Sequence, residues 1–320
     1  MYSITYILGN ANFYLANLAC SDLLLILLGV PLDVYYLWKP NFSISGTWFC
    51  VLKGTLIGTA TNVSIFTVVG FSWERFVAIC YPLIHRTYCD REHVLRYIAG
   101  TWLLAFFPAL VFAVQYRVRP DKIPVAICGQ VINTGTVCDL DPNEEIPHAF
   151  EFYLGIFFFL PMLMVAYFFT RIIITLQKSQ ELFATKTPSV SASGTPLIRR
   201  HPANLTQKSQ EAQLLVLRML IVVVCVFFAC YSPFHIQRLL TRHIKCHSEE
   251  EILSSLCQCL RIVWAVSGVL HFVSGAVNPI LYNMMSVRFR ASFVYYYKYL
   301  IGVIRYRLRR LTTSLTTSLI

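Results

Sequence analysis

Six apolar runs of membrane-spanning length recur along this chain of 320 residues and limit the folds that it can adopt. About 20 residues of helix, rising 1.5 Å each, cross the ~30 Å of hydrocarbon in a bilayer. Because lipid cannot hydrogen-bond to backbone groups, such runs span it as helices. They therefore predict an all-α membrane protein. The runs cover approximately residues 13–38, 51–80, 97–116, 151–176, 214–240 and 260–283.

The composition and the charge pattern agree with this class. Only 13% of the residues are charged and 56% are hydrophobic, whereas soluble domains carry about 25% charged residues. A net charge of +11 is also found in nucleic-acid-binding proteins, but here the basic residues follow the loops, in 86–96, 178–208 and 288–310. Acidic residues gather in 139–145 and 249–251. The positive-inside rule places the basic segments in the cytoplasm, and no nucleic-acid partner is expected.

Three other functional classes lack their signatures. The eleven cysteines do not show the C-x-x-C spacing of zinc sites, so no metal centre is expected. The histidines are scattered and no nucleophile stands with a base at readable spacing, so an enzyme is not expected. A transporter would show repeated halves with several mid-span charges, and Asp22 is the only clear charge of that kind.

Polar and helix-bending residues inside the runs indicate function, because they are costly in lipid. The amide of Asn278 needs an internal partner, and Pro279 removes a backbone hydrogen bond. Pro161 and Pro233 would create hinges in two other spans. The basic and aromatic segment from residue 288 is typical of a helix that lies on the membrane surface.

Cys50 and Arg75 mark opposite ends of one span, because 25 residues make ~37 Å of helix. Arg75 is then at the cytoplasmic face, and Cys50 lies just outside the membrane, where thiols oxidise. Cys138 and Cys128 in the outer loop of residues 117–150 are both candidate disulfide partners for Cys50.

Together these motifs resemble those of rhodopsin-like (class A) G-protein-coupled receptors. The resemblance rests on Cys50 upstream of Glu74-Arg75-Phe76, and on Asn278-Pro279-Ile280-Leu281-Tyr282 ahead of the surface helix. It implies a seven-transmembrane-helix receptor bundle, with six spans visible, plus an amphipathic helix eight. Residues 1–297 would form the bundle and residues 298–320 a cytoplasmic tail.

The first family helix has no counterpart in this reading. Tyr14-Leu15-Ala16-Asn17-Leu18-Ala19-Cys20-Ser21-Asp22 resembles the start of the second family helix, so residues 1–12 would form the first inner loop. We expect an incomplete gene model or a missing exon, with a natural six-span product as the alternative. Residues 182–210, rich in Ser, Thr and Pro, indicate a flexible cytoplasmic loop.

The resemblance implies roles for individual residues. It favours Cys138 as the partner of Cys50. At rest Glu74 would hold Arg75, which on activation would swing to meet a heterotrimeric G protein. The other residues of the switch would be Tyr231, Pro233, Asn278, Pro279 and Tyr282.

Asp22 lies mid-span, where an ionised carboxylate is costly unless it is paired. With Ser64, Ser274 and Asn278 it resembles the family's sodium pocket, whose oxygen ligands suit a hard cation. The alternative is a hydrogen-bonded polar cluster that holds no ion. No other cofactor is expected.

One position and three local sequence runs limit the class of ligand that the resemblance implies. Ile57 stands where aminergic receptors carry an acid, so a monoamine is not expected. The runs 23–35, 230–238 and 266–290 resemble neuromedin U and insect pyrokinin receptors, whose ligands are peptides ending in Pro-Arg-X-amide. Receptors for neurotensin-, ghrelin- or thyrotropin-releasing-hormone-like peptides are the alternatives.

In that family the resemblance assigns Asp33 to the arginine of the peptide and Arg238 to the amidated end. Phe234 and His235 would line the same pocket. The alternative is that Asp33 and Arg238 are ordinary interfacial charges.

The chain departs from this family at four positions. Gly58 replaces a second acid of the ligand pocket, Tyr231 replaces the switch tryptophan, Phe169 replaces a tyrosine, and Gln213 replaces an acid that locks Arg75 in some receptors. The first departure bears on the ligand, and the others bear on basal activity and efficacy.

We therefore predict a multi-pass receptor of the plasma membrane that binds an extracellular peptide and signals through heterotrimeric G proteins. The resemblance suggests Gq and calcium release. Receptor kinases and arrestin would be further partners of the hydroxyl-rich tail at 312–318. A truncated decoy that binds without signalling is the alternative.

Overall fold

A computed structural model describes residues 2–38, 46–125, 130–140, 146, 148–185, 202–244, 254–285, 298 and 301–302. The chain divides into two compact units, Met1–Ala276 and Val277–Ile320, and each is described by itself. The predicted surface helix falls on residues outside the described part, as does nearly all of the predicted tail.

Helices dominate the first unit, as the apolar runs predict. They are α1 (Tyr2–Trp38), α2 (Thr47–Cys80), α3 (Pro82–Tyr88), α4 (Arg91–Ala113), α5 (Ala149–Leu154), the π-turn η1 (Gly155–Phe159), α6 (Leu160–Thr185), α7 (Pro202–His243) and α9 (Ser255–Met285). The last helix continues into the second unit.

Six of these helices are long and apolar enough to cross a membrane, within the described residues. The all-α membrane class and the six spans are therefore confirmed. The helices extend further than the apolar runs do. α1 begins at Tyr2 inside the predicted inner loop, and α7 begins at Pro202, which suits the first turn because proline has no N–H to leave unpaired. The predicted loop at 182–210 is shortened by α6 and α7 accordingly.

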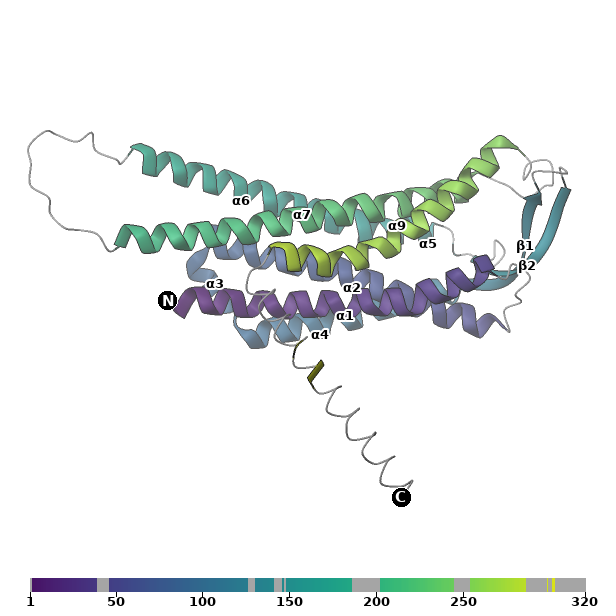
Figure 1. Ribbon diagram of the computed structural model, residues 1–320, viewed down its shortest axis with the longest axis horizontal. Helices are drawn as coiled ribbons and strands as arrows, with labels where there is room; N and C mark the ends of the chain where they lie inside the picture. The colour runs from purple at the N-terminus through teal and green to yellow at the C-terminus, as the bar shows by residue number, and fades with distance from the viewer. Residues whose placement is uncertain are drawn as a thin grey trace, which may run out of the picture. The chain divides into compact units, whose positions relative to one another are not determined.

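α2 is the centre of the first unit, and α1, α4 and α6 pack around it. Figure 1 shows α1, α2 and α4 running side by side. The buried face of α2 is unusually rich in Thr, Ser, Asn and Ala. In lipid, small residues allow close helix contact and hydroxyls bond across helices, so this composition suits a central position.

Two glycines permit the closest helix approaches. A Cβ on Gly70 of α2 would overlap the ring of Tyr97 on α4, whose hydroxyl donates to the carbonyl of Phe66 at 2.7 Å. A Cβ on Gly29 of α1 would overlap the ring of Phe272 on α9. These two contacts hold α2 against α4 and α1 against α9 at distances that no larger residue allows.

The outer loop at 117–150 is more ordered than the sequence analysis predicts. It contains an antiparallel hairpin of β1 (Tyr116–Val125) and β2 (Gln130–Leu140), with a register shift between Asp121 and Lys122. The hairpin lies beside the start of α2 (Figure 1). The sequence analysis did not foresee the hairpin, because strand pairing satisfies backbone hydrogen-bonding groups without requiring a long apolar run.

Candidate ligand-binding and signalling sites

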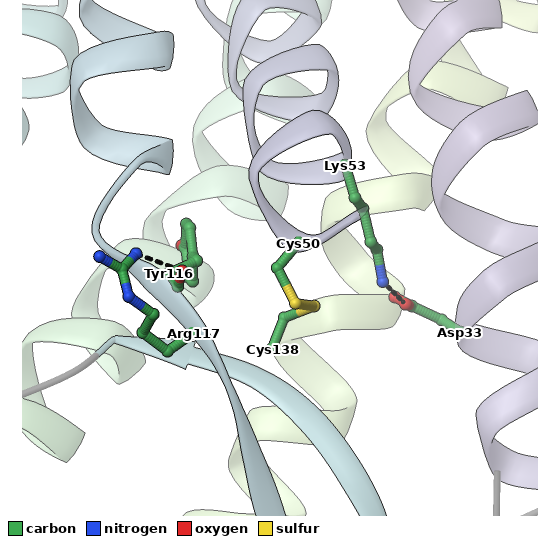
Figure 2. The surroundings of a disulfide bond; sticks show 6 residues. All are labelled: Asp33, Cys50, Lys53, Tyr116, Arg117 and Cys138. Carbon is green, nitrogen blue, oxygen red and sulfur yellow. Dashed lines mark hydrogen bonds and ion pairs between the residues drawn. A yellow bond between two sulfur atoms is a disulfide. The ribbon is translucent and has the colours of Figure 1, made fainter. Parts of the chain in front are cut away.

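The predicted outer end of the bundle carries a disulfide between Cys50 and Cys138. It joins the first turn of α2 to β2, across 88 residues of sequence (Figure 2). The predicted pairing is confirmed, and Cys128 lies outside the described residues. The disulfide holds the hairpin against the helix that forms the core.

Asp33 of α1 forms an ion pair with Lys53 of α2, with 2.8 Å between Nζ and Oδ1. Figure 2 shows the pair beside the disulfide. The Asp33 side chain is 43% exposed and that of Lys53 is 19% exposed. The sequence motifs point to Asp33 and not to Lys53, although a lysine one turn from Cys50 inside a span is itself a signal.

Arg238 and Phe234 on α7 lie together. The guanidinium carbon of Arg238 is 5.2 Å from the ring centre of Phe234, a cation–π distance. Phe234 in turn stacks on His271 of α9, with ring centres 4.4 Å apart. Phe234 therefore contacts both the charged side chain of Arg238 and the ring of His271 on the neighbouring helix.

His235 and Tyr231 complete this aromatic cluster, which we define as Phe158, Tyr231, Phe234, His235 and His271. The ring centres of His235 and Phe158 are 4.3 Å apart, and those of Tyr231 and His271 are 4.8 Å apart. Tyr231 is completely buried. The structure thus brings three predicted residues together and adds Phe158 and His271, which sequence analysis did not select.

A polar cluster lies around Asp22, which is 2% exposed. The hydroxyl of Ser64 is 3.3 Å from Asp22 Oδ1 and 2.9 Å from the hydroxyl of Ser21. The hydroxyl of Tyr231 faces Ser64 and Ser274 without forming a hydrogen bond of good geometry. Several buried oxygens therefore surround one carboxylate.

Ser274 reaches this region from α9. Its hydroxyl donates to the carbonyl of His271 at 2.6 Å, and the neighbouring Gly275 approaches Asp22 so closely that a Cβ there would lie 3.2 Å from the Asp22 Cβ. Asp22, Ser64 and Ser274 together fit the oxygen chemistry of a sodium site. Asn278 lies in the second unit, so its place in the pocket stays a prediction.

A second set of hydrogen bonds extends this polar cluster toward α4. The amide of Asn17 donates to Thr67 at 2.7 Å, and the indole N–H of Trp102 donates to Asn17 Oδ1 at 2.9 Å. The three residues come from α1, α2 and α4. The sequence alone does not show that Asn17 links Trp102 to Thr67.

Glu74 and Arg75 lie at the predicted cytoplasmic end of α2. Their charged atoms are 3.0 Å apart and both side chains are buried. His85 of α3 places its Nε2 3.6 Å from Glu74 Oε1, and the Arg75 guanidinium lies 5.4 Å from the ring centre of Phe71. The Glu74 oxygens form no directed hydrogen bond to the described residues, so a close ion pair holds the two together.

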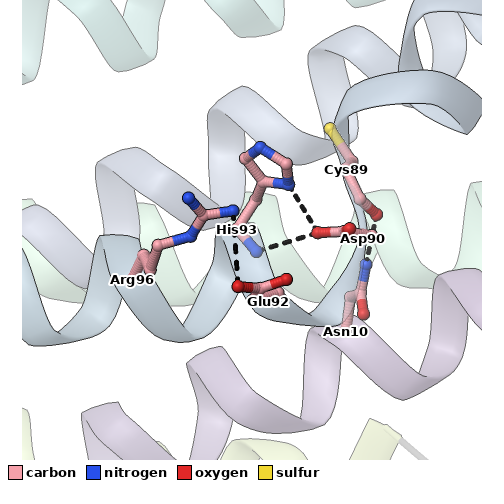
Figure 3. Close-up of polar contacts among 6 residues, drawn as sticks. All are labelled: Asn10, Cys89, Asp90, Glu92, His93 and Arg96. Carbon is pink, nitrogen blue, oxygen red and sulfur yellow. Dashed lines mark hydrogen bonds and ion pairs between the residues drawn. The ribbon is translucent and has the colours of Figure 1, made fainter.

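The loop after α3 connects to α1 and α4 at the same end (Figure 3). Asn10 donates to the carbonyl of Cys89 at 2.8 Å. Asp90 caps α4 by accepting a hydrogen bond from the backbone N–H of His93 at 2.8 Å. The imidazole ring of His93 also contacts the Asp90 carboxylate. These bonds hold the pKa of Asp90 below its usual value, whereas burial raises the pKa of the Cys89 thiol.

The remaining predicted switch residues lie in two helices. Pro233 lies inside α7, two residues after the cluster residue Tyr231. Pro279 lies inside α9, and the backbone of Tyr282 belongs to the same helix. Asn278, Pro279 and Tyr282 are in the second unit, and their contacts with the first unit stay predictions.

Comparison with known proteins gives one family match. The family described as "7 transmembrane receptor (rhodopsin family)" matches residues 7–282. The chain is 29% identical to the Pyrokinin-1 receptor of Drosophila melanogaster, with 88% of this chain and 70% of the relative covered. It is 30% identical to Neuromedin-U receptor 2 of Mus musculus (88% and 65% covered) and 29% identical to Neuromedin-U receptor 1 of Homo sapiens (88% and 64% covered). The chain thus spans slightly less than two thirds of the two neuromedin-U receptors.

Proposed function

On the premise that this chain belongs to the rhodopsin family of seven-transmembrane receptors, we propose that it is a receptor for an amidated neuropeptide ending in Pro-Arg-X. It would act at the plasma membrane and signal through heterotrimeric G proteins, of the Gq class, to release calcium. The family consists of receptors and not of enzymes.

The likeness to pyrokinin and neuromedin-U receptors over 88% of the chain is the observation that carries this proposal. Asp33 and Arg238 support it, because each lies near the outer end of its span and offers a charge to a peptide. The partly desolvated carboxylate of Asp33 would orient the arginine of the peptide. Such an ion pair contributes more to selectivity than to affinity.

The aromatic cluster offers a route from the ligand to the switch. Arg238 lies over Phe234, Phe234 stacks on His271, and His271 contacts Tyr231. Peptide binding would shift a pre-existing equilibrium between resting and active bundles. α7 would pivot at Pro233, where no backbone N–H restrains the helix, and Arg75 would leave Glu74 to contact the G protein.

We also propose that the polar cluster holds sodium in the resting state. Asp22 would supply the charge, and Ser64 and Ser274 would supply neutral oxygens. The competing proposal is that the same hydrogen bonds form a structural cluster without an ion.

A decoy receptor is a second candidate, favoured by one observation. Tyr231 is fully buried at the position where the family carries its switch tryptophan, and its ring stacks on Phe227 with ring centres 4.0 Å apart. A receptor with a packed tyrosine at this position would bind peptide normally but would transmit the signal to the G protein poorly.

The test is intracellular calcium in cells that display this chain, challenged with a panel of amidated Pro-Arg-X peptides. Surface labelling is recorded in the same wells, and the free-acid forms of the same peptides are the control. A saturable response to the amides supports the receptor. Peptide binding at the surface without calcium or nucleotide exchange identifies the decoy. Absence of binding despite good surface display rejects this ligand class.

A further inference from the structure

We propose that Lys53 is a built-in competitor for the arginine of the ligand, because it occupies Asp33 before the peptide arrives. The inference rests on the proposed function, in that Asp33 is the carboxylate which receives the peptide. It makes Lys53 a residue that lowers the affinity of the site for a cationic ligand.

The two partners of the ion pair differ in their exposure to solvent. Lys53 is 19% exposed, so most of its side chain is packed, whereas Asp33 is 43% exposed and accessible from outside. Lys53 Nζ lies 2.8 Å from Oδ1 of Asp33. An incoming cation can therefore approach the carboxylate before the ammonium has left.

Lys53 is held in position by the fold around it. It follows Cys50 by three residues on the same helix, and the disulfide from Cys50 to Cys138 fixes that end of α2 to the hairpin. A cation on the same chain has a high effective concentration at its partner. A peptide must overcome this advantage in order to bind Asp33.

The chemistry of the competing cations favours arginine over lysine. A lysine of the peptide would exchange one ammonium for another and would gain little. A guanidinium presents a planar fork of N–H donors that can bind both oxygens of the Asp33 carboxylate. An arginine of the ligand therefore displaces Lys53 from Asp33 more readily than a lysine of the ligand does.

Gly58, on the same helix as Lys53, supplies no second carboxylate. Gly58 stands where the resembling receptors carry an acid, and a Cβ there would lie 3.1 Å from the Cβ of Ala109 and 4.0 Å from the hydroxyl of Tyr153. A longer side chain at this position would crowd α4. Occupation of Asp33 by Lys53 is therefore not offset by a carboxylate at residue 58.

The experiment measures peptide affinity at the surface for the wild type and for Lys53→Gln. An amidated arginine peptide should bind Lys53→Gln about two- to fivefold more tightly, the scale of a partly exposed ion pair. The same peptide with citrulline in place of arginine has no charge, so its affinity should not change. Lys178→Gln, an exposed lysine at the predicted cytoplasmic end, is the matched control.

The arginine and citrulline peptides separate competition from a structural role. If Lys53→Gln weakens both peptides or leaves the arginine peptide unchanged, the inference is overturned. In an Asp33→Asn background, Lys53→Gln should have no further effect, and an undiminished effect there would also overturn it.

A separate measurement tests the role of Lys53 if the proposed function is wrong. If no peptide binds the wild type, the proposed ligand class is rejected, and the Lys53 resonance is then followed by NMR in the receptor with ¹³C-methylated lysines. Asp33→Asn and titration with arginine amide should move this resonance in the same direction. A resonance that does not respond to either change overturns the inference regardless of the natural ligand.

Discussion

The guanidinium of Arg75 lies 3.0 Å from the carboxylate of Glu74, the residue immediately before it, and both side chains are almost fully buried. Adjacent residues on a helix do not face each other, so both side chains must bend toward a common point. His85 of α3, the short helix that follows α2, approaches the same carboxylate. Glu74 therefore restrains Arg75 and also connects α2 to α3.

Replacing Glu74 with glutamine should raise basal nucleotide exchange on the G protein. The amide keeps the shape but removes the charge that holds Arg75, so the resting state should lose about 1 to 2 kcal/mol, or ~5- to 30-fold in population. Exchange is measured without peptide at equal surface display. Glu92→Gln, an exposed residue 3.8 Å from Arg96, should leave basal exchange unchanged. Unchanged or lower exchange in Glu74→Gln would reject the restraining role.

Replacing Arg75 with alanine tests the other half of the pair. It should abolish peptide-stimulated exchange while surface peptide binding is retained, because Arg75 lies at the opposite end of α2 from Cys50 and Lys53. Exchange and binding are measured on the same cells. If exchange persists, Arg75 is not the contact with the G protein, and its ion pair is structural.

Replacing Cys138 with serine should remove high-affinity peptide binding. The Cys50–Cys138 bond closes a long loop and fixes the hairpin to α2, and losing such a bond typically costs about 2–5 kcal/mol. Cys50→Ser should give the same result, and the double substitution should be no worse than either single one. Thermal unfolding in detergent checks stability alongside binding. Cys128→Ser, which leaves the Cys50–Cys138 bond intact, should have the smaller effect on both.

The spans and the Glu74–Arg75 pair were predictable because each depends on local sequence, whereas the choice of Cys138 over Cys128 as the partner of Cys50 came from the resemblance to the family. An apolar run, a cysteine at a helix start and a charged pair at a boundary are recognised without knowing the neighbours. The Lys53–Asp33 pair was not predictable in the same way. It depends on the rotation of α1 against α2, which packing decides.

The same distinction explains the other missed contacts. Asn17, Thr67 and Trp102 come from three helices, and their hydrogen bonds exist only once those helices are packed. His271 stacks on Phe234 for the same reason. The hairpin was missed because β-pairing is a long-range property and its strands carry no long apolar run.

Sodium should lower the affinity of an agonist peptide for the wild type, and Asp22→Asn should remove this dependence. The ion would stabilise the resting bundle through Asp22 and Ser64, so it would compete with activation. Affinity is measured with NaCl replaced by N-methylglucamine chloride at constant ionic strength. Ser64→Ala should weaken the sodium effect partially. Identical affinity in both salts would favour the structural polar cluster without an ion.

Two glycine substitutions should have opposite effects on stability. In Gly70→Ala the added Cβ would overlap the ring of Tyr97, and separating α2 from α4 should cost about 1–3 kcal/mol. It should also disturb the hydrogen bond from the Tyr97 hydroxyl to the carbonyl of Phe66. In Gly100→Ala nothing lies within 4 Å of the new Cβ, and alanine in a helix is favoured by up to about 1 kcal/mol. Thermal unfolding of the purified receptor in one detergent should therefore place Gly70→Ala below the wild type and Gly100→Ala at or above it. Equal melting temperatures for the two variants would show that α2 and α4 do not pack closely at Gly70.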